Sequence, residues 1–397
     1  MADITKIVEM DGRGALGEKI GLVVVALMAI GTIFVFSAGV EVGKGVDLLR
    51  FYESANLRKA LFFPLAVAVM LAAAQIDYRR FGFEKGLMRS PMTYLFIVSV
   101  GLLVVVLLPQ VGTKINQARR WLWIPLGPAT ISFQPSELAK WVVVFSLAGL
   151  CAKYGERMRL FWRGFLPVCG VVGLVAGLVI IEDFGSAALI ALLSFLILLA
   201  GGANWRYLVA PLPVAAAGFA AAVFLSPTRM MRILAFLHPE QWTGSANYQA
   251  SQSLIALGSG GVLGKGLGRG VCKYGHLPED TTDFIFSIIG EEMGFVGTAV
   301  VIALFIVFIV LGIMVVMRCR EPFGRLLATS IVLAVGVQAA LNIGVVTVVL
   351  PTKGLPLPFV SAGGTSMLLS AAAVGVLLNI ASQGRVANIE RRTLNGQ

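Results

Sequence analysis

The sequence predicts an all-α polytopic membrane protein with about ten transmembrane helices. Of its 397 residues, 57% are hydrophobic and only 13% are charged, and the mean hydropathy is +0.87. Soluble domains usually carry about 25% charged residues. No water-soluble core could bury this much apolar surface, so the bilayer is the expected solvent for most of the chain.

Ten apolar runs are the predicted spans, because a helix that crosses the bilayer needs about 20 mostly apolar residues. The run from Ile20 has no small-residue cleavage site close behind it, so we interpret it as a retained span rather than a signal peptide. Gly290, Glu291, Glu292 and Gly294 interrupt the eighth run, which predicts either a tilted or a broken helix. The runs cover residues 20–38, 60–76, 94–109, 139–152, 164–181, 186–200, 208–225, 284–317, 326–350 and 366–381.

Ten spans place both termini on one side of the membrane, and the basic residues indicate which side. With cytoplasmic termini, 18 of the 32 Lys and Arg residues fall in internal segments and 14 in the longer external segments. The positive-inside rule favours this orientation, so the net charge of +11 indicates membrane orientation rather than nucleic-acid binding. We expect one membrane domain over residues 1–397, with a cytoplasmic segment 1–19, a long external loop 226–283 and a cytoplasmic tail 382–397.

The external loops hold the features least expected of simple connections. Tyr248 to Leu257 predicts an amphipathic helix at the membrane surface, and Gly258 to Gly270 predicts a flexible segment after it. A second external connection covers about 110–138. The four cysteines match neither a metal site nor a disulfide framework. The two halves of the chain lack matching broken helices, which disfavours a transporter.

Two polar motifs begin helices at the external ends of predicted spans. Glu137 and Lys140, in Gln134-Pro135-Ser136-Glu137-Leu138-Ala139-Lys140, lie on one helix face. They fit an interfacial salt bridge, or a cavity in which Lys140 faces an anion. Asp183, in the short link after Glu182, either marks the water boundary, orders a cavity or pairs with Lys140.

Two further motifs lie beside the eighth and tenth spans. Asp283 stands at the mouth of the eighth span, where it fits either a helix N-cap or a general base with a pKa raised by burial. Pro351 to Ser366 is rich in proline and glycine yet apolar, which predicts a re-entrant or surface-lying loop over a cavity.

Basic side chains gather near the predicted outer face. Several cations around few carboxylates suit an anionic, pyrophosphate-bearing lipid, although contact with anionic headgroups would use the same residues. These cations are Lys114, Arg119, Arg120, Lys140, Lys265, Arg269, Lys273 and Lys353.

Five motifs, in order along nearly the whole chain, resemble the SEDS family (shape, elongation, division and sporulation) of the FtsW and RodA type. The Pro-Thr-Lys-Gly-Leu-Pro-Leu-Pro sequence from Pro351 looks more like the FtsW branch. The motifs are Gln134-Pro135-Ser136-Glu137, Asp183-Phe184-Gly185-Ser186, Leu277-Pro278-Glu279 with Thr282-Asp283-Phe284-Ile285-Phe286, Gly290-Glu291-Glu292-Met293-Gly294-Phe295, and Pro351 through Gly364.

The resemblance implies a peptidoglycan glycosyltransferase in the bacterial cytoplasmic (inner) membrane. Such an enzyme polymerises lipid II, a disaccharide pentapeptide linked to undecaprenyl pyrophosphate, at the outer face for septal wall synthesis in cell division. The implied partners are a class B penicillin-binding protein and other membrane proteins of the division or elongation complexes, with no nucleic acid.

The resemblance also implies site residues. The family's catalytic Asp maps onto Asp283, its cavity Glu and Lys onto Glu137 and Lys140, and its tryptophan-bearing loop onto Arg120-Trp121. We add the following residues as predicted substrate contacts: Asp183, Arg269, Lys353, Ser361 and Gly364.

The expected chemistry uses Asp283 to remove a proton from the acceptor sugar 4-hydroxyl, which attacks the donor anomeric carbon. Lys140 or Arg269 would hold the leaving pyrophosphate, and a divalent cation (Mg²⁺ or Mn²⁺) is an optional cofactor. Two alternatives stay open: a lipid II flippase or transporter, and a non-catalytic division scaffold.

Overall fold

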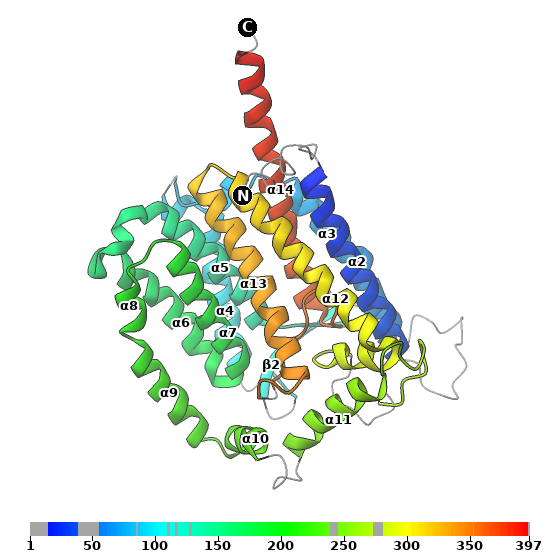
Figure 1. Cartoon of the computed structure of the whole chain (residues 1–397). Coiled ribbons are helices and arrows are strands. Elements are labelled where there is room, and N and C mark those ends of the chain that lie inside the picture. Colours follow the sequence, from blue (N-terminus) through cyan, green and yellow to red (C-terminus); the bar gives the residue numbers. More distant parts are fainter. Residues whose placement is uncertain are drawn as a thin grey trace.

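The computed structural model describes residues 15–38, 55–84, 86–108, 112–115, 118–126, 129–238, 245–272, 281–351 and 353–395. Its long helices form a bundle with a small sheet and two short helices gathered at one end (Figure 1). The helices are α2 (Ala15–Ala38), α3 (Ala55–Ala74), α4 (Pro91–Leu107), α5 (Pro135–Tyr154), α6 (Leu166–Glu182), α7 (Phe184–Ala200), α8 (Trp205–Val209), α9 (Leu212–Phe224), α10 (Pro227–Leu237), α11 (Ser245–Ser259), α12 (Ile285–Arg318), α13 (Pro322–Val346) and α14 (Gly364–Asn395). The predicted fold class of a helical, multi-spanning membrane protein is confirmed.

Six stretches of helix among the described residues are long and apolar enough to cross a membrane, and three shorter apolar helices match further predicted spans. The predicted span 208–225 differs from the others. It holds the last residues of the five-residue helix α8 and the 13-residue helix α9, with a break between them. Figure 1 shows α9 directed away from the bundle, and its Val214 and Phe224 side chains are exposed. The long helices are, by residue number, 16–38, 135–159, 161–182, 285–318, 322–346 and 364–383, and the shorter ones are 61–74, 91–107 and 184–200.

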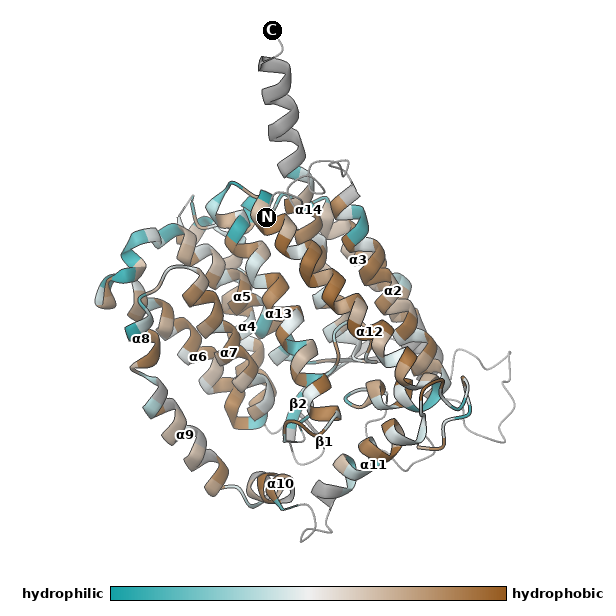
Figure 2. Cartoon of the chain, in the orientation of Figure 1, coloured by the Kyte–Doolittle hydropathy of each residue, from teal (hydrophilic) through white to brown (hydrophobic). Residues whose placement is uncertain are grey.

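Helix α5 is the centre of the bundle. Its side chains are buried from Pro135 to Cys151 with few exceptions, and it packs against α4, α7 and α13. A helix that is apolar on every face must be enclosed on every face. In contrast, apolar residues cover the outer surfaces of the peripheral helices, and hydrophilic residues concentrate at the ends of the bundle (Figure 2). The peripheral surface therefore suits contact with lipid.

The predicted loop 110–138 contains an antiparallel sheet that the sequence analysis did not anticipate. Strands β1 (Thr113–Ile115), β2 (Ala118–Leu126) and β3 (Ala129–Phe133) lie in the order β1-β2-β3, with Leu122 opposite Phe133. Apolar and polar residues alternate only over a few positions in this stretch, and prolines and glycines interrupt them. The two-residue period therefore gave only a weak indication of strands. The sheet leads directly into α5 through Gln134.

Helix α12 is broken at Gly294, as one of the two sequence interpretations proposed. Gly294 has φ of 64°, a conformation that favours glycine, and the amides of Phe295 and Val296 donate to the carbonyls of Gly261 and Val262 instead of continuing the helix. The break thus lets the chain from the glycine segment (residues 258–270) lie against α12.

The glycine segment is held by α12, whereas the sequence predicted a flexible segment. Glu291 and Glu292 are buried, and their carboxylates accept hydrogen bonds from the segment, from the two residues after it and from α2. The donors to Glu291 are Lys265 Nζ (2.7 Å), Val271 N (2.9 Å) and Cys272 N (3.1 Å), and those to Glu292 are Ser37 Oγ (2.8 Å), Gly268 N (3.0 Å) and Gly270 N (3.4 Å). The glycine content suggested mobility. In the structure, glycines instead allow close contact between two backbones, because glycine has no side chain to keep them apart. We call this contact the glutamate clamp.

The segment between α13 and α14 is irregular and re-enters the bundle. Residues 353–363 form no helix, yet Leu357, Phe359 and Val360 are buried. The Phe359 ring packs 6.3 Å from the ring of Phe308, which lies well along α12. This re-entrant segment (residues 353–363) confirms the predicted departure from regular helix and places its backbone beside the start of α12.

Candidate functional site

The re-entrant segment meets the turn that carries Asp283 through backbone and hydroxyl contacts. Ala362 N donates to Thr281 O (2.9 Å), and Ser361 Oγ makes a short hydrogen bond to Thr282 O. The same Ser361 hydroxyl accepts from Leu357 N (2.7 Å). Ser361, a predicted substrate contact, is therefore buried and engaged with its own protein, and the two segments form one unit.

Asp283 lies at the edge of this unit and is half-buried. The N-cap of α12 is Phe284, and no side chain caps the helix. The N-cap role, one of the two alternatives for Asp283, is thus absent. A methyl group added at Gly354 would lie 2.7 Å from Asp283 Oδ2, so the carboxylate rests directly on the backbone of the re-entrant segment.

Asn342 of α13 ties the two segments together from behind. Its Nδ2 donates to Asp283 O (2.8 Å) and to Leu355 O (2.6 Å). Its Oδ1 is buried and has no hydrogen-bond partner among the described residues. A buried unpaired carbonyl costs free energy, so an asparagine here is explained by its two N–H donors rather than by its oxygen.

Gln338, one turn earlier on α13, links the same segment to the buried charges of α5. Lys140 Nζ donates to Gln338 Oε1 (2.7 Å) and pairs with Glu137 Oε2 (2.8 Å), while Gln338 Nε2 donates to Pro356 O (2.8 Å). Lys140 and Glu137 are 1% and 2% exposed. The predicted salt bridge on one helix face is present, and the contact of Lys140 with a substrate anion stays a prediction.

Asp183 caps α7 and does not bond Lys140. Its Oδ1 accepts from Ser186 N (3.1 Å), and its Oδ2 accepts from Ser186 Oγ (2.7 Å) and Gln134 Nε2 (3.3 Å). A side-chain oxygen at this position satisfies the first free amides of the helix. Asp183 therefore both starts α7 and fixes Gln134, the residue before α5.

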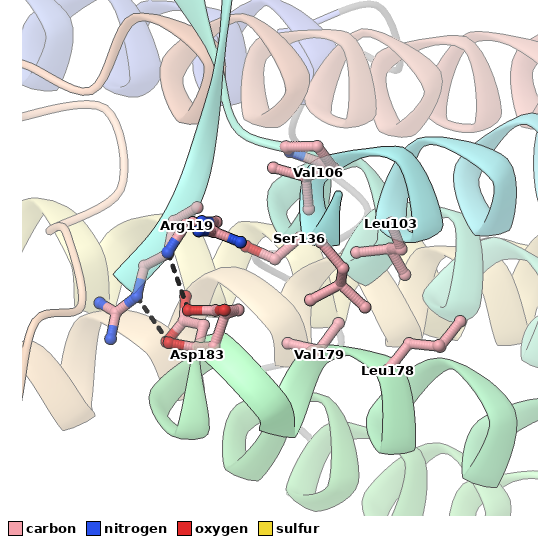
Figure 3. A pocket seen from close by; sticks show the side chains of 11 residues that line it. Leu103, Val106, Arg119, Ser136, Leu178, Val179 and Asp183 are labelled. Carbon is pink, nitrogen blue, oxygen red and sulfur yellow. Dashed lines mark hydrogen bonds between the residues drawn. The ribbon is translucent and has the colours of Figure 1, made fainter. Parts of the chain in front are cut away.

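A pocket that is open to solvent lies between α4, the start of α5, α6 and β2 (Figure 3). One wall is aliphatic, and the other carries Arg119, Arg120, Ser136, Glu182 and Asp183. Arg119 N donates to Glu182 Oε2 (2.8 Å) and Arg120 Nε to Glu182 O (2.8 Å), as the dashed lines in Figure 3 show. The two hydrogen bonds to Glu182 fasten the sheet to the end of α6. The aliphatic residues of the pocket are Leu103, Val106, Leu107, Leu178 and Val179.

The remaining predicted substrate contacts lie in several different elements. Lys353 Nζ sits 4.8 Å above the ring of Phe184, so it reaches the start of α7 from the re-entrant segment. Gly364 leaves room for the ring of Phe62, which a methyl group would meet at 2.6 Å. Trp121 is a half-buried residue of β2, and Arg269 is an exposed residue of the glycine segment.

Sequence reasoning missed Gln338 and Asn342. Both are uncharged amides inside an otherwise apolar span, which is the signal that could have found them, since polar groups at membrane depth need a partner. Among the described residues, no group of three or more His, Cys, Asp or Glu side chains is placed to hold a metal. The optional divalent cation stays a prediction, and no step below depends on it.

Comparison with known proteins identifies the family. The family model described as "Cell cycle protein", FTSW_RODA_SPOVE, matches residues 18–386. The chain belongs to this family. The "Probable peptidoglycan glycosyltransferase FtsW" of Trichlorobacter lovleyi is 38% identical over 369 residues, which cover 92% of this chain and 93% of that protein. The protein of the same name from Aromatoleum aromaticum is 39% identical over 363 residues, covering 89% and 85%.

Solved structures share the fold. A chain from a structure described as "Structural coordination of polymerization and crosslinking by a peptidoglycan synthase complex" has a TM-score of 0.70 at 25% identity, covering 92% of this chain and 97% of its own. The rod shape determining protein RodA of Thermus thermophilus has a TM-score of 0.61 at 24% identity, covering 92% and 96%. The family and the multi-spanning architecture therefore agree.

Proposed function

We propose that this protein is a peptidoglycan glycosyltransferase that polymerises lipid II at the outer face of the cytoplasmic membrane for septal wall synthesis. The names of the relatives support the reaction class. The observation that carries the proposal is Asp283, a half-buried carboxylate just before the N-cap residue of α12 that rests against the backbone of Gly354. An acidic group held at such a helix mouth suits a general base.

Asp283 accepts the proton of the acceptor sugar 4-hydroxyl as that oxygen forms a bond to the donor anomeric carbon. The bond from that carbon to the pyrophosphate oxygen breaks, and undecaprenyl pyrophosphate leaves. Pyrophosphate is already a good leaving group, so one carboxylate suffices. Cations such as Lys140 and Arg269 would hold its charge, and in this structure Lys140 donates to Glu137 and Gln338.

Replacement of Asp283 by asparagine tests the assignment. We expect Asp283→Asn to keep expression, folding and partner binding and to lose at least about 100-fold in polymerisation rate, since a general base contributes about 10²- to 10⁴-fold. The measurement is glycan-strand formation from purified lipid II by the chain with its partner. Parent-like activity in this variant contradicts the catalytic role.

The same assay separates the two alternative functions. A flippase would move lipid II between vesicle leaflets without forming glycan, and a scaffold would bind its partner but do neither. The cluster of polar motifs at one end of the bundle, rather than along a path through it, favours the enzyme.

The partners and orientation belong to the same proposal. A related chain comes from a complex that couples polymerisation and crosslinking. We infer that this chain works with a class B penicillin-binding protein and further division or elongation proteins, and that its termini are cytoplasmic. The start of α2 and the end of α14 lie at one end of the bundle, opposite β2, α10 and α11, which is compatible with an outward-facing site (Figure 1).

A further inference from the structure

We propose that Asn342, supported by Gln338, is a positioning residue that sets the location of the Asp283 carboxylate through the re-entrant segment. This inference rests on the proposed function, because it assigns these amides to the reaction in which Asp283 is the base. Neither amide has to touch the substrate. Each acts on the backbone to which the reacting side chain is attached or against which it rests.

Two hydrogen bonds from one amide group define the spacing between the two segments. Asn342 Nδ2 donates to Asp283 O at 2.8 Å and to Leu355 O at 2.6 Å. The carbonyl of the base and a carbonyl one residue beyond Gly354 are thus held by the same nitrogen. Asn342 lies on the rigid helix α13 and is 1% exposed, so solvent does not compete for these bonds.

Gln338 extends the support by one helical turn. It lies four residues before Asn342 and therefore on the same face of α13. Its amide group donates to Pro356 O (2.8 Å), next to the carbonyl that Asn342 holds, and its oxygen accepts from Lys140 Nζ (2.7 Å). Two successive carbonyls of the re-entrant segment, at 355 and 356, are therefore fixed to α13.

The far side of the Asp283 turn is fixed by the same segment. Ser361 and Ala362 bond the carbonyls of Thr282 and Thr281, so the turn is held at three consecutive carbonyls, 281, 282 and 283. These bonds fix the main chain from which the Asp283 side chain extends, and the backbone of Gly354 limits the space on one side of its carboxylate. Reacting groups that move by about 1 Å can lose about 10²-fold in rate.

The unpaired side-chain oxygen of Asn342 indicates that an asparagine stands here for the two hydrogen bonds that its amide nitrogen donates. Oδ1 has no hydrogen-bond partner among the described residues. A leucine at 342 would avoid that unpaired oxygen in an apolar span but would release both carbonyls. The unpaired oxygen is thus the cost of holding Asp283 O and Leu355 O together.

Two variants test the inference in the full chain with its partner, using purified lipid II. Asn342→Asp removes both donors and sets a carboxylate against two carbonyls. Gly354→Ala leaves Asn342 and Gln338 intact but places a methyl group 2.7 Å from Asp283 Oδ2. Gly354 is exposed and has an ordinary φ, so the Asp283 side chain, rather than the fold, must move. We expect kcat to fall about 10- to 100-fold in both, with KM for lipid II changed less than about threefold.

Matched controls separate positioning from general stability. Asn379→Asp removes a buried amide donor at the opposite end of the bundle, where Asn379 Nδ2 bonds Ala74 O (2.8 Å). Gly173→Ala adds a methyl group to open space on α6. Both should keep kcat per folded molecule, even where the melting temperature of Asn379→Asp falls. A third variant, Gln338→Glu, keeps the acceptor for Lys140 but loses the donor to Pro356, so kcat should fall less than in Asn342→Asp.

The outcomes are decisive whether or not Asn342→Asp folds. Parent-like kcat in Gly354→Ala overturns the proposal, and so does an equal loss of kcat in Asn379→Asp and Asn342→Asp. A rise in KM with unchanged kcat also overturns it, because that result indicates substrate binding rather than positioning. Failure of the proposed function is seen separately, as a parent chain that forms no glycan from lipid II.

Discussion

At the scale of single residues, the two buried charges of α5, on Lys140 and Glu137, neutralise each other within the protein. Lys140 and Glu137 pair at 2.8 Å with side chains 1% and 3% exposed. A charge buried this deeply is stable only with such compensation. The pair therefore serves the fold, and hydrogen bonds through Gln338 link Lys140 to the re-entrant segment.

Removal of one partner of this pair should destabilise the protein strongly. We expect Lys140→Met to lower the free energy of unfolding by about 3–5 kcal/mol, because Glu137 would remain buried without its counter-charge. Thermal unfolding in detergent, followed by intrinsic fluorescence, provides the measurement. The double variant Lys140→Met with Glu137→Gln should recover most of the loss, and a double variant as unstable as the single one contradicts the pairing argument.

At the scale of elements, the glutamate clamp joins the glycine segment to α12. Glu292 accepts from the amides of Gly268 and Gly270, and Glu291 accepts from the amides of the two residues that follow. Gly260, Gly264 and Gly294 allow the backbones to touch. Any side chain at these glycines would meet backbone atoms within 2.5 Å. The clamp thus fixes the chain shortly before residues 281–283.

Cys272 is a natural reporter of the clamp. Its thiol is buried, and this burial raises its pKa, with a further increase from the Glu291 carboxylate. Only the thiolate reacts with maleimide, so the reaction of the parent is slow and accelerates only as pH rises towards this raised pKa. In a chain whose other three cysteines are replaced by serine, we expect Glu291→Gln to increase the labelling rate and to shift its rise to lower pH.

The rate at which Cys272 reacts with a fluorescent maleimide, measured from samples quenched at set times between pH 7 and 9, tests this prediction. The matched control keeps Cys319 as the single cysteine, since it lies at the opposite end of α12 and should react equally with and without Glu291→Gln. An unchanged rate at Cys272 shows that the clamp does not hold the segment.

At the scale of the whole molecule, the site is one-sided. The re-entrant segment, the Asp283 turn, the sheet and the two helices α10 and α11 share one end of the bundle, and the end of α14 lies at the other (Figure 1). Contacts between α2, α12, α13 and α14 connect the two ends through the apolar core. A lipid-linked substrate would reach such a site from the bilayer.

Cysteine accessibility tests the proposed orientation. In a chain without its four native cysteines, Leu267→Cys in the glycine segment and Arg157→Cys near the end of α5 are both exposed positions. An impermeant maleimide added to spheroplasts should label Leu267→Cys directly and Arg157→Cys only after permeabilisation, because the positive-inside rule places Arg157 in the cytoplasm. The reverse pattern would falsify the orientation.

The sequence by itself determined the architecture and the position of the catalytic candidate. Apolar runs of span length predicted most of the membrane helices, because the bilayer requires about 20 apolar residues per crossing. Glycines and carboxylates inside the eighth run predicted its break, and Pro351 to Ser366 predicted an irregular, re-entrant connection. Polar residues at span mouths located Asp283, Glu137 and Lys140, since charge near the bilayer is costly and therefore conspicuous in a hydropathy pattern.

Only the tertiary structure decided what these groups do to one another. The antiparallel sheet, the glutamate clamp and the Asn342–Gln338 support all depend on contacts between segments far apart in the chain, which periodicity and composition do not encode. Asn342 and Asp283 are 59 residues apart, and one hydrogen bond of 2.8 Å joins them. A polar residue in a span is a cap, a counter-ion or a positioning group according to which atoms lie within about 3 Å of it. Only the folded chain determines which atoms those are.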